Sequence, residues 1–302
     1  MDDAKISRVI KAEFSRHNDA LIEREVRRLR RFGPLSFNAA PYQVDPQDFC
    51  DRMQGYCSIE ARQVDGDAFE KWYVENDYRL LFEDYTKTYP DENLLKKKAF
   101  EHWLSLRETE GASGGVVLDV GCATSPFFRL WKREESPATP FLRVDLPLPE
   151  YGFLPGRNGD VIGCSADAIP LDDQSVARIY SHNAIEHFEG GAYAGFFKEC
   201  ARVLQPGGVL YVCPLFVACS TFAYVSLTGI YRRLSFPKII GGTNLVYSDA
   251  VGQPYELYID TDFLTNRIIG PLEKMLDFHL IMYTGHAAVE HDVRLGLLAI
   301  QK

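Results

Sequence analysis

From residue 116 onward the chain alternates short apolar segments with stretches of helical spacing, and this alternation limits the fold more than any other feature. Strands joined by helices form parallel sheets that helices cover on both faces. Two further apolar segments near the end fit an antiparallel closure of such a sheet. We therefore expect an α/β fold with a seven-stranded sheet, its strands at residues 116–120, 141–145, 160–165, 177–182, 209–213, 278–284 and 293–300. Helices are expected near residues 126–135, 191–204 and 262–277.

The N-terminal part of the chain has a different pattern, which predicts a mainly helical segment. Between Ile6 and Leu29, apolar residues recur at spacings of three and four, as on one face of a helix. The glycine-rich residues 111–115 form a short link to the alternating part. We predict a helical N-terminal extension or cap over residues 1–112 and the α/β domain over residues 113–302.

Composition excludes several partners. Of the 302 residues, 33 are Lys or Arg and 42 are Asp or Glu, which gives a formal charge of −9. Nucleic-acid-binding domains usually carry a net positive charge, so this composition disfavours a nucleic-acid partner. The seven cysteines include no CxxC pair and the N-terminus lacks the apolar core of a secretory signal, which favours a reducing, cytoplasmic location. Residues 203–231 carry no charge, but Pro206 and Pro214 interrupt them, so we expect a buried strand and loop and no membrane span.

The first expected strand ends in a turn that suits a ligand. The segment VVLDVGCATSPFF (116–128) places Asp119 near the end of a buried strand and Gly121 in the turn that follows. In open parallel sheets, ligands bind at the carboxyl ends of strands, and glycine lets the backbone approach a ligand closely. The turn departs from the dinucleotide pattern, because Ala123 replaces the second glycine and the third is absent. Asp119 suits a ligand with a positive end, such as an ammonium group.

Two more acids follow later strands. Asp145 closes the strand FLRVD, about twenty residues past the glycine turn, where a carboxylate can accept hydrogen bonds from both hydroxyls of a ribose. The alternative for Asp145 is an exposed carboxylate at a strand end. Asp167 follows the third strand in SADAIPLDD, and ARVLQPGGVLYV (201–212) combines a helix, a Pro-Gly-Gly turn and a strand.

With these segments in this order, the chain resembles the class I S-adenosylmethionine-dependent methyltransferases, especially their small-molecule, methyltransferase type 11-like branch. The resemblance covers about residues 113–215, and its most specific part is ADAIPLDDQSVARIYSHNAIEH (166–187) joined to LQPGGVLYV (204–212). It implies a Rossmann-like sheet and S-adenosylmethionine as cofactor.

The resemblance also implies which residues surround the methionine end of the cofactor. Asp119, Gly121 and Ala123 would line that end, and Asn183, just past the fourth strand, would approach the sulfonium through its backbone.

At the nucleoside end, the resemblance implies a second group of contacts. Asp145 and Leu146 would hold the ribose and the adenine face. Asp167 would accept from the adenine amino group, and the N–H of Ala168 would reach the ring.

A hydroxyl acceptor needs a general base as well as alignment with the methyl donor. His187, at the start of the helix after the fourth strand, is the candidate base, because imidazole takes up a proton near neutral pH. The alternatives are a structural histidine bonded to nearby backbone, or a cofactor contact, and His182 is a weaker rival. We predict no metal site, since no zinc or iron motif matches the spacing of His279, His286, Glu290 and His291.

Residues 215–261 form a long, aromatic-rich insertion before the sixth strand. Long connections are often functional, so we expect a lid that closes over the acceptor together with the N-terminal extension. The alternative is a dimer surface or additional core. Residues 200–248 carry four cations and no acid, a charge of +4, which favours a small anionic or lipid-linked acceptor.

These observations predict a methyltransferase that acts on a small molecule, with an oxygen of a sugar, glycan precursor or secondary metabolite as the first choice. An N- or C-methyltransferase, a noncatalytic cofactor-binding scaffold and a nicotinamide oxidoreductase are the alternatives. The oligomeric state is left open.

Overall fold

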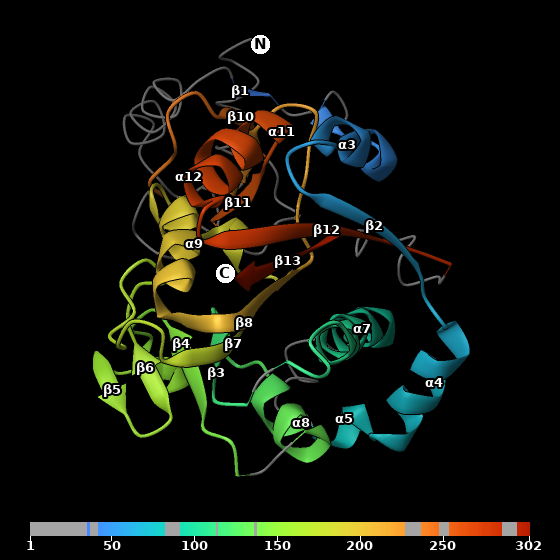
Figure 1. Ribbon diagram of the computed structural model, residues 1–302, viewed down its shortest axis with the longest axis vertical. Coiled ribbons are helices and arrows are strands. Elements are labelled where there is room, and N and C mark those ends of the chain that lie inside the picture. The colour runs from blue at the N-terminus through green and yellow to red at the C-terminus, as the bar shows by residue number, and fades with distance from the viewer. Residues whose placement is uncertain are drawn as a thin grey trace, which may run out of the picture.

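The computed structural model (Figure 1) describes residues 35–36, 42–81, 91–112, 114–135, 138–226, 237–247, 254–285 and 295–302. Several sequence predictions concern residues outside these ranges. They are the amphipathic helix between Ile6 and Leu29 and the candidate ligands His286, Glu290 and His291.

Within the described residues, the main sheet has nine strands in the order β2-β12-β13-β8-β7-β3-β4-β6-β5. From β8 to β6 the neighbours are parallel, whereas β13 pairs antiparallel with both β8 and β12. The predicted Rossmann-like α/β fold with an antiparallel closure is confirmed. The strands are β2 (Ser58–Gln63), β3 (Val116–Val120), β4 (Phe141–Asp145), β5 (Gly156–Asn158), β6 (Val161–Gly163), β7 (Val176–His182), β8 (Leu204–Cys213), β12 (Leu276–Thr284) and β13 (Leu295–Gln301).

Two edge strands extend the sheet beyond the predicted seven. β5 forms an antiparallel hairpin with β6, and all its residues are exposed. β2 lies in the segment predicted to be a helical extension, yet it pairs in parallel with β12 along the opposite edge. Its sequence, SIEARQ, has no fully buried side chain, so backbone pairing rather than an apolar face holds it there. Hydrophobic periodicity therefore gives no sign of either strand.

Several helices begin with an aspartate that caps the first turn. The side chains of Asp45, Asp65 and Asp91 accept backbone N–H groups at the first turns of α3, α4 and α7. The helices are α3 (Pro46–Met53), α4 (Gly66–Glu75), α5 (Tyr78–Leu81), α7 (Glu92–Glu108), α8 (Phe127–Glu134), α9 (Ala192–Val203), α11 (Thr261–Leu264) and α12 (Gly270–Leu272). The short 3-10 helices η2 (Pro149–Tyr151) and η3 (Ile185–His187) and the π-helical turn η4 (Thr265–Ile269) complete the set.

The predicted helices near residues 126–135 and 191–204 are confirmed as α8 and α9. The helix expected over residues 262–277 is shorter than predicted. It ends at Leu272 after the π-helical turn, and strand β12 begins at Leu276.

The helices form a layer on each face of the main sheet, as Figure 1 shows. One buried cluster joins α3, α9 and α11 to the sheet, and the other joins α4, α7 and α8 to its opposite face. Phe196 and Phe197 of α9 are fully buried. Burial of one such side chain stabilises the fold by about 1.5–3 kcal/mol relative to exposure.

The insertion over residues 215–261 contains most of a second, four-stranded sheet with the order β1-β10-β9-β11. Phe222 stacks on Tyr258 and on Tyr42, with ring centroids 4.8 and 5.0 Å apart. These strands are β1 (Leu35–Ser36), β9 (Phe222–Val225), β10 (Asn244–Tyr247) and β11 (Tyr255–Tyr258). Among the described residues, no helix is both long and apolar enough to cross a membrane.

Candidate functional site

Three of the predicted residues lie at one edge of the main sheet. β3, β4 and β7 are parallel neighbours, so their carboxyl ends meet at the same edge. Asp119 lies one residue before the end of β3, Asp145 ends β4, and Asn183 directly follows β7. The structure therefore brings these side chains together where ligands bind in open parallel sheets.

The turn after β3 packs closely against the segment after β7. Gly121 has a φ of +75°, and a Cβ there would lie 2.4 Å from the Cβ of Ala184. Its N–H donates to the carbonyl oxygen of Val144 at 2.8 Å. Ala123 also has a positive φ, +38°. The turn thus follows a path that only a glycine at position 121 permits, even without the full dinucleotide pattern.

Asp145 holds this turn in place through backbone amides. Its Oδ2 accepts the N–H of Ala123 at 2.6 Å, and its Oδ1 accepts the N–H of Leu146 at 2.7 Å. Burial raises the pKa of Asp145, and these two hydrogen bonds oppose that rise. Each carboxylate oxygen keeps a further lone pair for a ligand hydroxyl. The side chain of Leu146 is beside it and is 45% exposed.

Asp167 and Ala168 lie in a turn after β6. The hydroxyl of Ser165 donates to Oδ1 of Asp167 at 2.5 Å, and the N–H of Ala168 donates to the carbonyl oxygen of Ser165 at 3.0 Å. A Cβ on Gly195 of α9 would lie 2.6 Å from the Cβ of Asp167, so the turn lies directly on that helix. The Ala168 amide that was predicted to reach adenine is thus bonded within its own turn.

Asn183 connects the sheet edge to α7. It has a φ of +45°, its N–H donates to the carbonyl oxygen of Cys213 at 3.3 Å, and its side-chain amide donates to Oε2 of Glu101. Glu101 is fully buried and also receives the ammonium of Lys98 at 3.5 Å. Burial raises the pKa of Glu101, while Lys98 opposes the rise.

His182 lies between α7 and Asp119. Its Nε2 is 2.6 Å from Oγ of Ser105, and its Nδ1 is 3.7 Å from Oδ1 of Asp119. The arrangement has the order of a Ser-His-Asp triad, but the Ser105 hydroxyl donates to the carbonyl of Glu101 at 2.9 Å. The Ser105 oxygen therefore accepts a hydrogen bond from His182. Because the hydroxyl proton points away from the imidazole, this serine is not an activated nucleophile.

The buried polar face of α7 is absent from the sequence predictions. Lys98, Glu101, His102 and Ser105 are all buried. Their spacing of three, four and seven residues from Lys98 puts them on one side of a helix, which was the available signal.

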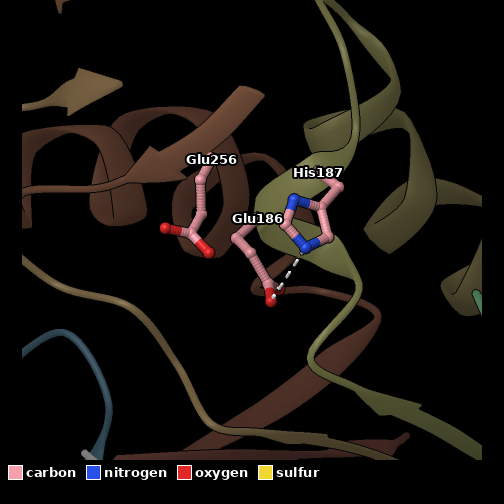
Figure 2. A group of neighbouring side chains, drawn as sticks. All are labelled: Glu186, His187 and Glu256. Carbon is pink, nitrogen blue, oxygen red and sulfur yellow. Dashed lines mark ion pairs between the residues drawn. The ribbon is translucent and has the colours of Figure 1, made fainter. Parts of the chain in front are cut away.

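His187 lies in a cluster with two glutamates from different elements (Figure 2). Glu186 and His187 belong to η3 and Glu256 to β11, and candidate ligand atoms of the three lie within 4.8 Å of one another. Nδ1 of His187 is 2.8 Å from the carbonyl oxygen of Tyr255, and Nε2 is 3.6 Å from Oε1 of Glu186. A carbonyl only accepts, so Nδ1 carries the proton and donates it. Nothing in the sequence connects position 256 with positions 186 and 187.

Burial also changes the acidity of this cluster. It raises the pKa of Glu186 to about 8. Burial and, to a smaller extent, the charge of Glu186 raise the pKa of Glu256, although His187 acts in the opposite direction.

Residues 118–212 match the family model of a methyltransferase domain. This segment contains the glycine turn, the acids near the ends of β3 and β4, helix α9 and most of strand β8, in which the Pro-Gly-Gly residues lie. The matched segment therefore belongs to the methyltransferase-domain family. A domain of this family agrees with the S-adenosylmethionine cofactor that the sequence resemblance implied.

The chain is similar to several solved structures, at low sequence identity. A Pyrococcus horikoshii protein is 20% identical, with 52% of this chain and 66% of that chain covered and a TM-score of 0.33. A Burkholderia thailandensis 1,6-didemethyltoxoflavin-N1-methyltransferase is 11% identical, with 81% and 93% covered and a TM-score of 0.44. The chain spans just under two thirds of the length of the Pyrococcus protein. No curated protein matches the chain.

The cations of the insertion region are only partly described. Arg202, on α9, binds Glu199 and Asp173, each at 2.6 Å, and its guanidinium also donates to the carbonyl of Ile169. The Arg202 side chain therefore stabilises the loop after Asp167 and does not point toward the proposed acceptor site. Two of the other three cations in residues 200–248 lie outside the described residues.

Proposed function

We propose that this methyltransferase transfers the methyl group of S-adenosylmethionine to an oxygen of a small molecule, such as a sugar, a glycan precursor or a secondary metabolite. The observation that carries the proposal is the orientation of His187. Its Nδ1–H is held by the Tyr255 carbonyl, so in the neutral ring Nε2 has the lone pair that can take a proton. His187 follows four residues after Asn183, at the cofactor edge of the sheet.

The residues at the methionine end fit the cofactor. Oδ2 of Asp119 is buried and has no hydrogen-bond partner among the described residues, so it is available to the ammonium of the methionine moiety. Gly121 and Ala123 form the turn beside it, where the missing side chain at position 121 leaves the backbone accessible. In our proposal, Asn183 presents its backbone to the sulfonium side.

The nucleoside end fits in the same way. Asp145 is held by two amides and can accept the ribose hydroxyls with its remaining lone pairs. The exposed side chain of Leu146 offers an apolar surface to adenine. Asp167 is the proposed acceptor for the adenine amino group. The N–H of Ala168, which donates to the carbonyl oxygen of Ser165, would also contact the ring.

The reaction needs little more than alignment and removal of one proton. The acceptor oxygen forms a bond to the methyl carbon as the bond from that carbon to sulfur breaks, and S-adenosylhomocysteine leaves. The hydroxyl proton passes to Nε2 of His187. The protein contributes by holding the donor and acceptor in line and by positioning the base.

The acceptor site in this proposal lies between α7 and the insertion. Strand β11 of the insertion supplies both Glu256 and the Tyr255 carbonyl that holds His187. Helix α7 approaches from the other side through Glu101, which binds Asn183. These contacts support the proposal that the insertion and the N-terminal extension enclose the acceptor together.

A nitrogen acceptor is the second candidate, and the acidity of the site favours it. Glu101, Glu186 and Glu256 lie around the proposed acceptor position, where their carboxyl oxygens can accept hydrogen bonds from the N–H groups of an amine. An amine would also need to lose a proton before attack, so the same base would serve.

The test combines binding with turnover. Calorimetry should show S-adenosylhomocysteine binding to the parent protein and to His187→Gln with similar affinity. With labelled S-adenosylmethionine and panels of hydroxyl and amine acceptors, His187→Gln should lower kcat on hydroxyl acceptors at least about tenfold, within the usual contribution of a general base. His279→Gln, a histidine on strand β12, is the control. Equal turnover by His187→Gln would leave this residue with the structural role, and transfer to amines alone would select the second candidate.

A further inference from the structure

The Glu186–His187–Glu256 cluster has the geometry of a cation site. Its candidate ligand atoms come from η3 and β11 and lie within 4.8 Å of one another. Two ligands on opposite sides of a divalent ion lie about 4.2 Å apart, given bond lengths of about 2.1 Å. Figure 2 shows the three polar ends turned toward one another, so small side-chain rotations would bring them to such distances.

The buried state of Glu186 points independently to a ligand. The residue is 2% exposed, and its Oε2 is buried with no hydrogen-bond partner among the described residues. A carboxylate oxygen without a partner in the interior is costly, and proteins usually pair it or place it on a metal. Its other oxygen, Oε1, is the atom nearest Nε2 of His187.

The ion pair of Lys98 lies outside the cluster. Lys98 acts on both Glu186 and Glu256, but it is bound to Glu101 at 3.5 Å. When both glutamates are ionised as ligands, a bound divalent ion would itself offset their buried charge.

The outer contact of His187 is the kind that metal-bound histidines make. Such a histidine usually donates its other ring N–H to a carbonyl or carboxylate, which fixes the tautomer and leaves the second nitrogen for the metal. His187 donates Nδ1–H to the Tyr255 carbonyl at 2.8 Å, so Nε2 is the coordinating nitrogen.

We propose that Glu186, His187 and Glu256 bind a divalent metal ion of the manganese or zinc class. Two carboxylates and one imidazole give an oxygen-rich donor set that these ions accept. Three protein ligands leave coordination positions open, and η3 follows directly from the cofactor edge. The ion would thus be able to bind the acceptor oxygen and polarise it.

This role at the acceptor rests on the proposed methyl transfer and changes one part of it. When the ion is bound, Nε2 of His187 is a ligand, and the ion takes over activation of the acceptor oxygen. Acceptors that present two neighbouring oxygens to the ion would then be the preferred class. Binding of the ion itself does not depend on the methyl-transfer proposal.

The experiment uses Mn²⁺ as the probe on the full chain after treatment with a chelator. Electron paramagnetic resonance of free Mn²⁺ should show saturable binding of one ion per chain. Glu256→Gln and Glu186→Gln should each raise the Kd at least about tenfold, as expected for loss of a ligand. Glu60→Gln is the matched control, because Glu60 also lies beside a histidine, His279, at 3.5 Å, but in an exposed position.

Binding of S-adenosylhomocysteine, measured on the same samples, verifies that each variant is folded. If Glu186→Gln fails to fold, Glu256→Gln carries the test, because its side chain is less buried. Absence of saturable Mn²⁺ binding would overturn the proposal, and so would a Kd unchanged in Glu256→Gln. Methyl transfer that is insensitive to the chelator would overturn the role at the acceptor while leaving the proposed function intact.

Discussion

Replacement of Gly121 by alanine tests the close contact between the cofactor turn and the segment after β7. A Cβ at position 121 would lie 2.4 Å from the Cβ of Ala184, and the local φ of +75° is strained for any residue with a side chain. The backbone strain costs about 1–2 kcal/mol. Forcing a methyl group into a packed site costs about 1–3 kcal/mol. The free energy of unfolding should therefore fall by about 2–5 kcal/mol in Gly121→Ala.

A matched control separates the two contributions. Gly159 also has a positive φ, +65°, but a Cβ there would meet nothing within 4 Å. Gly159→Ala should therefore lose only the backbone part, about 1–2 kcal/mol. Both substitutions restrict the unfolded chain equally, so that effect cancels between them. In the double variant Gly121→Ala/Ala184→Gly the obstructing methyl is gone, and part of the loss should be recovered.

Urea unfolding followed by circular dichroism gives these free energies, and calorimetry gives the affinity for S-adenosylhomocysteine. We expect Gly121→Ala to bind the ligand more weakly than Gly159→Ala, since only position 121 lies in the proposed cofactor site. The reasoning fails if the two single variants are equally stable, or if Ala184→Gly restores nothing to the Gly121 variant.

Three further predictions address the cofactor, the buried helix face and the N-terminal extension. Asp145→Ala should weaken S-adenosylhomocysteine binding by a few kcal/mol at most, through lost charge-assisted hydrogen bonds, and unchanged affinity in calorimetry would remove Asp145 from the site. Burial holds the pKa of His102 well below its usual value. Below about pH 6.5 the unfolded chain therefore binds a proton at His102 that the folded protein does not, and the free energy of unfolding falls by about 1.4 kcal/mol per pH unit. Above that pH His102 adds no pH dependence. In urea unfolding His102→Gln should flatten this dependence, and parallel profiles for variant and parent would contradict it. Arg62 of β2 contacts the buried Glu108 of α7 at 2.6 Å, so Arg62→Ala should lower the free energy of unfolding by about 1–3 kcal/mol. The double variant Arg62→Ala/Glu108→Gln should regain most of the lost free energy of unfolding. If Arg62→Ala leaves that free energy unchanged, β2 is not part of the cooperative fold.

The central part of the fold could be predicted because its strands are buried. β3, β4, β7 and β8 consist largely of apolar residues, which distinguishes them from the helices between them. The acids near the ends of β3 and β4 were equally visible, since parallel strands bring their carboxyl ends to one edge. The edge strands were not, because β2 and β5 contain no fully buried side chain and so lack the apolar pattern of a buried strand.

The sequence by itself determined the parallel sheet, its antiparallel closure and the order of residues along the carboxyl edge of the parallel strands, since local periodicity and chain order suffice for these. Only the tertiary structure decided what surrounds the proposed acceptor position. Glu101 meets Asn183 across 82 positions of the chain, and Glu256 joins Glu186 and His187 through a strand of the insertion. A contact between distant segments has no periodicity of its own. It arises when helix α7 and strand β11 pack against the sheet edge, and burial then changes the acidity of the groups that are brought together.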